Sequence, residues 1–173
     1  MARAFIGVGS NIDPETNVRK ALQLLAHQVR IVGISTFYRT PPLGRPDQPP
    51  FWNGVVDVDT DILPIELKHN VLQEIEDELG RVRTEDKYAP RTIDLDIIIY
   101  GNIVIASSQL TIPDPGIARR AFLALPLCEL APDLIVPGMG KPICDMADSL
   151  SADDMEPLPE YTALLREDLQ NEY

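Results

Sequence analysis

Two aspartates stand one residue apart in an apolar run, because Asp94 and Asp96 both lie within Thr92–Tyr100. Alternate side chains of a β-strand point to the same face, so the two carboxylates would lie about 6–7 Å apart on one side of a sheet. The other side would receive the core residues of the run, Ile93, Leu95, Ile97 and Ile99. Two such carboxylates are costly unless they are paired or bound to a metal, and a hard divalent cation shared with phosphate oxygens meets that need. The alternative is a half-exposed strand with two solvated aspartates.

A basic stretch directly precedes the aspartates, although the chain as a whole is acidic. Four cations fall within residues 81–91, namely Arg81, Arg83, Lys87 and Arg91, and the pair Arg119-Arg120 follows downstream. Arginine forks make bidentate contacts to phosphate. Each cation taken alone is explained as well by solvation and pairing with Glu85 or Asp86. Next to a carboxylate pair, the group indicates a polyphosphate site.

Two further segments have the composition of pocket walls. The opening Gly7-Val8-Gly9-Ser10-Asn11 lacks the ending of a P-loop and the third glycine of a dinucleotide fingerprint, so it predicts a tight strand-to-helix turn. The segment Thr40–Pro50 contains five prolines and leads into Phe51, Trp52 and Asn53. A flat heterocycle needs such a set, with a ring to stack on and an amide to read its edge. The alternative is a stiff loop with one aromatic side chain in the core.

Strand and helix patterns alternate around these motifs. Strands are predicted over Ala4–Gly9, Ile31–Tyr38, Phe51–Thr60, Thr92–Tyr100 and Ile103–Ile105, and helices over Asn17–His27 and from Pro64 to Leu79, with Gly80 just past the end. This order predicts an α+β fold, a ferredoxin-like antiparallel sheet with helices packed on it, extra strands and a helical C-terminal end. A doubly wound sheet would need a helix between Ile31 and Thr60.

Charge restricts the partners of the chain. Its 173 residues include 27 acidic and 15 basic side chains, which gives a net charge of −12. That charge argues against nucleic acid and anionic membranes as partners, and no apolar run approaches the roughly 20 residues of a membrane helix. Residues 151–173 carry seven acids and one base, Arg166. We predict a short helix over Tyr161–Leu169 and make no prediction of order for the rest of this tail.

Two cysteines, Cys128 and Cys144, are too few for a disulfide framework and suit a reducing cytoplasm, where we expect the protein to reside. We take Cys128 as a free thiol packed in a C-terminal helix and assign no role to Cys144.

Taken in order, the motifs resemble the 6-hydroxymethyl-7,8-dihydropterin pyrophosphokinase family of folate biosynthesis. The resemblance runs from Gly7 to about Pro137, and the series is specific although no single piece is. It rests on Gly-x-Gly-Ser-Asn, Thr40-Pro41-Pro42-x-Gly44, Asp47-Gln48-Pro49-x-Phe51-x-Asn53, Gly80-Arg81-x-Arg83, Pro90-Arg91-Thr92-Ile93-Asp94-Leu95-Asp96, Leu110-x-Ile112-Pro113-x-Pro115, Arg120-x-Phe122 and Pro126-Leu127-x-Glu129-x-Ala131-Pro132. It implies a monomer with a single pyrophosphokinase domain over residues 1–150, followed by an acidic C-terminal extension over 151–173.

The resemblance implies that the terminal pyrophosphoryl group of ATP passes as a unit to the pterin hydroxymethyl group and leaves AMP. ATP is then the co-substrate, and two Mg²⁺ ions are held by Asp94 and Asp96, which carry catalysis together with Arg81 and Arg91. The residues implied in ATP binding are Arg81, Arg83, Arg91, Ile97, Asp114 and Arg120. Those implied in the pterin pocket are Thr40, Pro42, Leu43, Phe51, Asn53 and Phe122, with Asn53 reading the pterin edge and the two phenylalanines enclosing its ring. Lys87 and Tyr88 fall on a loop that closes over the site.

Two positions depart from the family pattern. The family has His where this chain has Asp114, which puts negative charge near the nucleotide phosphates and weakens ATP binding unless Arg119 or a cation offsets it. Ala89 replaces the usual glycine before Pro90, which would stiffen the closing loop.

Three other interpretations stay open at this point. A weakened homologue, motivated by Asp114, would bind ATP or pterin without turnover. An RNA-binding module of the same fold needs a basic sheet face with exposed aromatics, which the net charge and the missing Gly-Phe pattern disfavour. A different Asp-x-Asp metal-dependent transferase, acting on a nucleotide sugar, would leave Asp47–Asn53 and Arg120-x-Phe122 unexplained.

Overall fold

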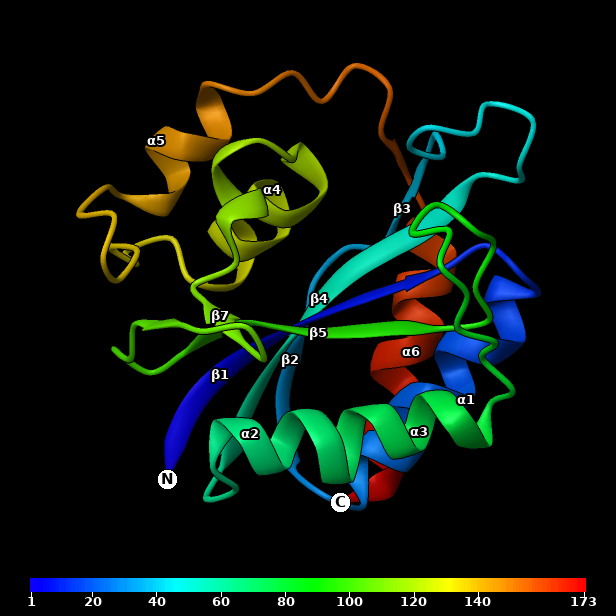
Figure 1. Ribbon diagram of the computed structural model, residues 1–173, viewed down its shortest axis with the longest axis horizontal. Coiled ribbons are helices and arrows are strands. Elements are labelled where there is room, and N and C mark those ends of the chain that lie inside the picture. The colour runs from blue at the N-terminus through cyan, green and yellow to red at the C-terminus, as the bar shows by residue number, and fades with distance from the viewer.

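A central antiparallel sheet organises the computed structural model, which describes all of residues 1–173 (Figure 1). The strands of the sheet are β1 (Ala2–Ser10), β2 (Arg30–Ile34), β3 (Tyr38–Thr40), β4 (Phe51–Thr60), β5 (Asp94–Tyr100) and β8 (Glu156–Pro157). They are ordered β5-β1-β4-β3-β8, and β2 also pairs with β4. A separate hairpin joins β6 (Ile105–Ala106) to β7 (Thr111–Ile112).

Helices cover both faces of the sheet (Figure 1). One face carries α1 (Pro14–Ala26), α2 (Pro64–Glu66), α3 (Gln73–Glu78) and α6 (Pro159–Glu172), with a π-helical segment (Leu67–Leu72) joining α2 to α3. The other face carries α4 (Ala121–Leu130) and α5 (Ile143–Asp148), and a short 3₁₀ helix (Pro115–Ala118) precedes α4. This arrangement confirms the α+β, ferredoxin-like class.

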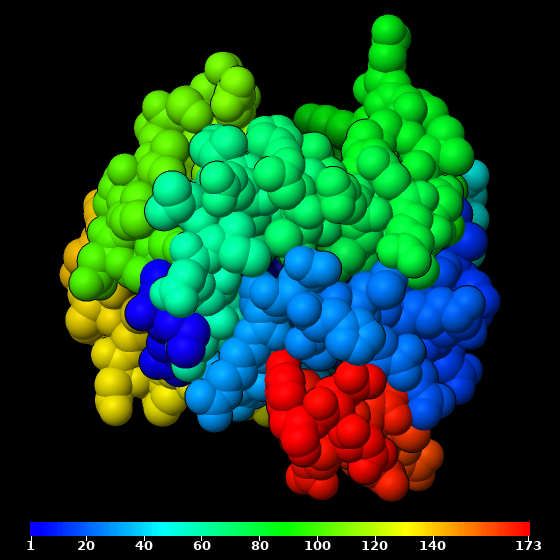
Figure 2. Space-filling model, turned by 90° about the horizontal axis from the view of Figure 1, so that it is seen from below, coloured from blue at the N-terminus to red at the C-terminus, as the bar shows by residue number.

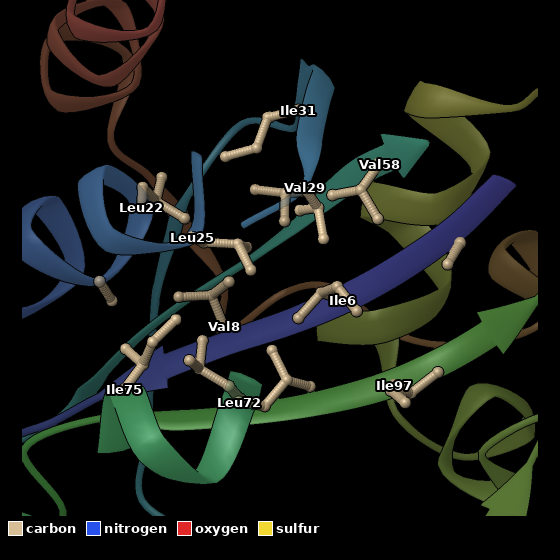
Figure 3. Packing of buried hydrophobic residues seen from close by; sticks show 14 of the residues in the cluster. Ile6, Val8, Leu22, Leu25, Val29, Ile31, Val58, Leu72, Ile75 and Ile97 are labelled. Carbon is tan, nitrogen blue, oxygen red and sulfur yellow. The ribbon is translucent and has the colours of Figure 1, made fainter. Parts of the chain in front are cut away.

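The main hydrophobic core lies between the sheet and the α1–α3–α6 layer. Ile6 and Val8 of β1 lie between Leu25 of α1 and the helix that carries Leu72 and Ile75 (Figure 3), and each of the five is at most 5% exposed. Figure 2 shows the outer surface of this layer, where α6 lies beside α1. Burial of a side chain of this size stabilises the fold by about 1.5–3 kcal/mol. The strands that carry the site are therefore packed against helices on the face of the sheet opposite the site.

A second cluster fills the opposite face, beneath α4 and α5. It includes Phe5, Val55, Ile98, Leu123 and Leu127. The β1–β5 register shifts between Phe5 and Ile6, which pair with Ile99 and Ile97 and leave one residue of β5 unpaired. Such a bulge breaks the alternation of side chains. The prediction that Ile99 shares a core with Ile97 is therefore wrong, because Ile99 packs in the second cluster.

Most predicted elements are present with shifted ends. The helix predicted from Pro64 runs to Glu78, and Gly80 follows with a φ of +80°, which suits glycine. The strand predicted over Ile31–Tyr38 is interrupted after Ile34. Ser35 causes the break, since its hydroxyl accepts a 2.9 Å hydrogen bond from Val55 N in place of a regular ladder contact.

The acidic tail is part of the folded structure. Strand β8 extends the sheet beside β3, and α6 is longer than the predicted helix. Leu165 is 2% exposed and belongs to the main core, while Asp168 forms a 2.5 Å ion pair with Arg19 of α1. The apolar periodicity that would predict α6 is weak, because Thr162 and Leu165 are the only buried residues of this helix.

The prediction of free cysteines is wrong. Cys128 of α4 and Cys144 of α5 form a disulfide, which closes a loop with a sequence separation of 16. The two helices pack together and bring the thiols into reach, which spacing in the sequence does not reveal. The cysteines consequently give no support to a reducing compartment.

None of the helices combines the length and the apolar character that crossing a membrane requires.

Candidate active site

Two cavities meet at three aspartates, Asp94, Asp96 and Asp114, which we call the carboxylate wall. The first, of about 300 Å³, lies on the α4 face of the sheet, and the second, of about 330 Å³, lies beside the outer edge of β5. Asp94, Asp96 and Asp114 line both of them. The two cavities differ in their other residues, so they suit ligands of different chemistry that meet at the three carboxylates.

The first cavity has aromatic walls and an amide. Phe51 and Phe122 both line it, together with Thr40, Leu43 and Asn53. Asn53 Nδ2 donates a 2.7 Å hydrogen bond to Thr40 Oγ1, which fixes the amide. The opposite strand must leave room for that amide: a Cβ atom on Gly9 would lie 2.6 Å from Asn53 Oδ1. Pro41 lines the cavity, whereas Pro42, the residue expected there, does not.

The second cavity is strongly polar and contains Arg81 and Arg83. Both arginines are held by Glu76 of α3, a carboxylate whose side chain is only 5% exposed. Arg83 Nη2 donates to Glu76 Oε1 over 2.7 Å, and Arg81 donates to Glu76 Oε2 and, over 3.0 Å, to Asp94. Glu76 also accepts a 2.9 Å bond from Leu95 N of β5. It therefore fixes the arginines to the strand that carries the aspartates.

Ile97 lines this second cavity but is 5% exposed and packs in the main core, so its contribution there is a wall rather than a polar contact. Arg120 lines the first cavity instead of the second, with its guanidinium 5.9 Å from the centre of the Phe122 ring. The expected phosphate-binding arginines thus approach the carboxylate wall from both sides.

Two loops cover the first cavity, and we name them the proline loop (residues 41–50) and the closing loop (residues 84–91). They lie side by side (Figure 1): Arg45 pairs with Asp86, and Gln48 Nε2 donates to Tyr88 O over 2.5 Å. The Tyr88 ring lies against Gly44, and Lys87 and Tyr88 line the cavity as expected. The closing loop is therefore docked over the site.

Asn11, which is 3% exposed, fastens both loops. Its Nδ2 donates to Gln48 Oε1 over 3.0 Å and to Pro49 O over 3.3 Å. Its Oδ1 accepts a 2.9 Å bond from Arg91 N, while Arg91 Nη1 donates to Asp94 Oδ2 over 2.7 Å. Arg91 is thereby held at the carboxylate wall.

Asp96 is the electrostatically unsatisfied member of that wall. Asp94 is paired with two arginines, but no hydrogen bond from the protein reaches the Asp96 carboxylate. The Asp96 side chain reaches solvent through the cavities, yet desolvation by the protein packed around it, and then the charges of Asp94, Glu76 and Asp114, raise its pKa to about 8, against a smaller opposing effect of Arg81. The position favours either a proton or a cation.

Asp114 begins the 3₁₀ helix. Its Oδ1 accepts a 2.7 Å bond from Gly116 N, so the carboxylate caps that helix while facing both cavities. Arg119, named as a possible counter-charge, makes no ion pair and is exposed. The negative charge of Asp114 instead adds to that around Asp96.

Sequence reasoning missed two residues of the site, Glu76 and Asn11. An acidic residue in a helix is usually solvated, so Glu76 gives no clear sign of its role. The available signal was its position, one turn from the buried Leu72 and next to Ile75, on the face of the helix that packs on the sheet. Asn11 falls in the predicted turn and ends the Gly-x-Gly-Ser-Asn motif of the resemblance, but neither pattern assigns it a role in the site.

Comparisons with known proteins identify the family of this chain. The family model described as 7,8-dihydro-6-hydroxymethylpterin-pyrophosphokinase matches residues 5–132. The 2-amino-4-hydroxy-6-hydroxymethyldihydropteridine pyrophosphokinase of Haemophilus influenzae is 40% identical over 79% of this chain and 86% of its own. That of Pseudomonas aeruginosa is 37% identical over 91% of this chain and 97% of its own. These matches define an enzyme that transfers pyrophosphate from ATP. The chain belongs to the 7,8-dihydro-6-hydroxymethylpterin-pyrophosphokinase family.

Solved structures share the fold. The wild-type HPPK-DHPS of Plasmodium falciparum matches with a TM-score of 0.70 at 14% identity, over 86% of this chain and 44% of that one. This chain thus spans less than half of that protein, and the likeness concerns the fold alone.

Proposed function

We propose that the enzyme transfers the terminal pyrophosphoryl group of ATP to 6-hydroxymethyl-7,8-dihydropterin in folate biosynthesis, in a Mg²⁺-dependent reaction that leaves AMP. The observation that carries the proposal is the meeting of two unlike cavities at Asp94, Asp96 and Asp114. One suits a flat heterocycle and the other a polyanion. The names of the relatives state the pterin for those proteins, and the motifs of this chain support the same substrate here.

The pterin would occupy the first cavity. Phe51 and Phe122 would offer ring faces for stacking, and the amide of Asn53, oriented by Thr40, would bind the polar edge of the heterocycle. This orientation would direct the hydroxymethyl group toward the carboxylate wall. Leu43 and Pro41 would exclude water from the ring.

The triphosphate would extend from the second cavity to the same wall. Arg81, Arg83 and Arg91 are arranged by carboxylates before any ligand is bound, so little reorganisation is needed when phosphate replaces those carboxylates as their partner. Arg120 would contact the chain of phosphates from the pterin side. The hydroxymethyl oxygen would form a bond to the β-phosphorus while the bond from that phosphorus to the α–β bridging oxygen breaks. AMP would leave with the bridging oxygen, and the hydroxyl proton would be released with the products.

The residues present suit magnesium. Asp96 has no protein partner and stands among further negative charges, and no group of three His, Cys, Asp or Glu side chains is close enough to hold a metal without other ligands. Mg²⁺ is bound in such sites by one or two carboxylates together with substrate phosphates. Asp94 and Asp96 would hold the two ions, which reduce the negative charge of the phosphates when bound.

Loop closure would protect ATP from water. Lys87 and Tyr88 cover the first cavity while the closing loop is docked on the proline loop. An excluded-water site favours transfer to the pterin over hydrolysis.

The direct test is product analysis. Purified protein is incubated with ATP, Mg²⁺ and 6-hydroxymethyl-7,8-dihydropterin, each omitted in turn, and AMP, ADP and the pterin diphosphate are separated by chromatography. We expect AMP and pterin diphosphate in equal amounts only in the complete mixture, a loss of at least about 100-fold in Asp96→Asn, and no loss in Asp154→Asn, an exposed acid of the tail. ADP as the product, or full activity of Asp96→Asn, would contradict the proposal.

Asp114 supports a second candidate, a weakened homologue that binds ATP or pterin without turnover. Binding of either ligand in a titration, with no AMP formed in the product assay, would favour it. A monomeric state, a cytoplasmic location and the absence of nucleic-acid partners stay predictions.

A further inference from the structure

We infer that the C-terminal segment, residues 156–169, is a positioning element for the pterin pocket, acting through Thr162 and Tyr161. We call it the C-terminal brace. The inference rests on the proposed function, because it assigns the pterin to the cavity that contains Asn53 and Thr40. The brace lies beyond residues 5–132, the part of the chain that the family model matches.

The brace is joined to β3 by backbone contacts. Strand β8 pairs with β3 through Tyr38–Pro157 and Arg39–Glu156, and Leu158 N donates to Phe37 O over 2.8 Å. Strand β3 itself ends at Thr40, the partner of Asn53. The brace therefore forms the outer neighbour of the strand that orients the amide of the pocket.

Thr162 completes this connection inside the protein. It is 2% exposed, and its Oγ1 accepts a 2.9 Å bond from Phe37 N and donates a 2.8 Å bond to Leu158 O. The acceptor is needed because Phe37 N is buried and has no other partner there. A side chain of the same shape without an oxygen would leave that N–H unsatisfied.

Tyr161 makes the second connection, to the strand that carries Phe51 and Asn53. Its ring meets the Trp52 ring edge to face, with 4.8 Å between centroids, and its hydroxyl donates to Glu15 O of α1 over 2.7 Å. Burial raises the pKa of Tyr161, so the hydroxyl remains a donor at neutral pH. The Tyr161 ring of the brace thus packs against the Trp52 side chain of β4.

Phe37 connects the brace to the strand of the pocket, because it contacts both Thr162 and Gly54. Its ring is fully buried and lies so close to Gly54 that a Cβ atom there would be 2.5 Å from it. Gly54 follows Asn53 directly, and Trp52 precedes it. The backbone on both sides of the Asn53 amide is therefore supported from the opposite face of the sheet by residues that the brace holds.

No comparable contact links the brace to the second cavity. None of the residues that line that cavity belongs to the segment 156–169, and none shares a hydrogen bond or an aromatic contact with Thr162 or Tyr161. Disturbing the brace should therefore alter pterin binding while ATP binding is unchanged. A merely structural role would lower the stability of the whole protein and affect both ligands alike.

The test compares three variants of the full chain. Thr162→Val removes the acceptor at constant shape and Thr162→Ser keeps it. The control, Glu172→Gln, removes a contact of the same helix that lies beyond the brace, between Glu172 and His27. The pterin dissociation constant is measured by fluorescence titration, the ATP dissociation constant by calorimetry, and folding by thermal unfolding.

We expect Thr162→Val to weaken pterin binding about tenfold, with the ATP constant within about twofold of the wild type. Thr162→Ser should restore pterin binding, and Glu172→Gln should leave both constants unchanged. Unchanged pterin binding in Thr162→Val, or equal weakening of both ligands, would overturn the inference.

Two further variants keep the test decisive. If Thr162→Val does not fold, Tyr161→Leu removes the contact with Trp52, and the same selective loss of pterin affinity is expected; retained affinity would overturn the inference. Asn53→Ala separates this inference from the proposed function. If Asn53→Ala binds pterin as the wild type does, the pocket itself is wrongly assigned. If Asn53→Ala loses affinity while the brace variants do not, only the brace is refuted.

Discussion

Replacement of Asp96 by asparagine should stabilise the metal-free protein at pH 8. The pKa of Asp96 is raised to about 8 by desolvation from the surrounding protein and by three neighbouring carboxylates, whereas an unfolded aspartate titrates near 3.9. Between these two values the folded state binds the proton more tightly than the unfolded state does. Stability therefore falls as the pH rises from about 4 to about 8, and Asp96→Asn removes this loss because the amide carries no charge.

The size of the effect follows from the same pKa. Four pH units at about 1.4 kcal/mol each give an upper bound of about 6 kcal/mol. The carboxylate reaches solvent through the cavities, and screening reduces such effects strongly, so we expect about 1–2 kcal/mol. For a protein of this length that corresponds to a melting temperature about 3–6 °C higher.

The assay is thermal unfolding in EDTA at several pH values from 5 to 9, with Asp154→Asn as the control. The advantage of Asp96→Asn should grow with pH up to about 8, and the control should show no such trend. Added Mg²⁺ and ATP should stabilise the wild type more than the variant. An Asp96→Asn protein that melts at or below the wild-type temperature at pH 8 would refute the electrostatic reasoning.

Three more outcomes are expected. Glu76→Gln leaves two arginines without their buried partner, so stability should fall by about 3 kcal/mol and the KM for ATP should rise at least tenfold; an unchanged KM in kinetic assays would contradict this. Asp114→His removes a negative charge near the phosphates and should lower the KM for ATP, although the cap on Gly116 N is lost; an unchanged or raised KM would count against it. Reduction of the Cys128–Cys144 disulfide, or its replacement by serines, should cost about 3 kcal/mol for a loop of this length, and equal unfolding curves with and without reductant would disprove that.

The local part of the site was predictable because strand alternation is a local property. Asp94 and Asp96 were expected on one face, and they line the same two cavities. The same holds for Phe51 and Asn53, which alternate with Trp52 and reach the first cavity together. A period of two, once a strand is recognised, assigns such residues without knowledge of the tertiary structure.

Contacts between distant elements were not predictable. Glu76 and Leu95 are separated by 19 positions, and Phe37 and Thr162 by 125. Their roles depend on how the helices pack on the sheet, which no local pattern encodes. The prediction for Ile99 is wrong for a related reason. The bulge in β5 is set by its pairing with β1, and the register between two strands is a property of the pair.

The attachment of both loops to Asn11 has a consequence for the motion of the protein. The proline loop and the closing loop share one buried amide and are also joined to each other, so neither can move far without breaking contacts of the other. The two loops at the mouth of the first cavity would then open together, at one rate. Amide protons of both loops would exchange with solvent at matched rates, and breaking the shared anchor would turn one concerted motion into two independent ones.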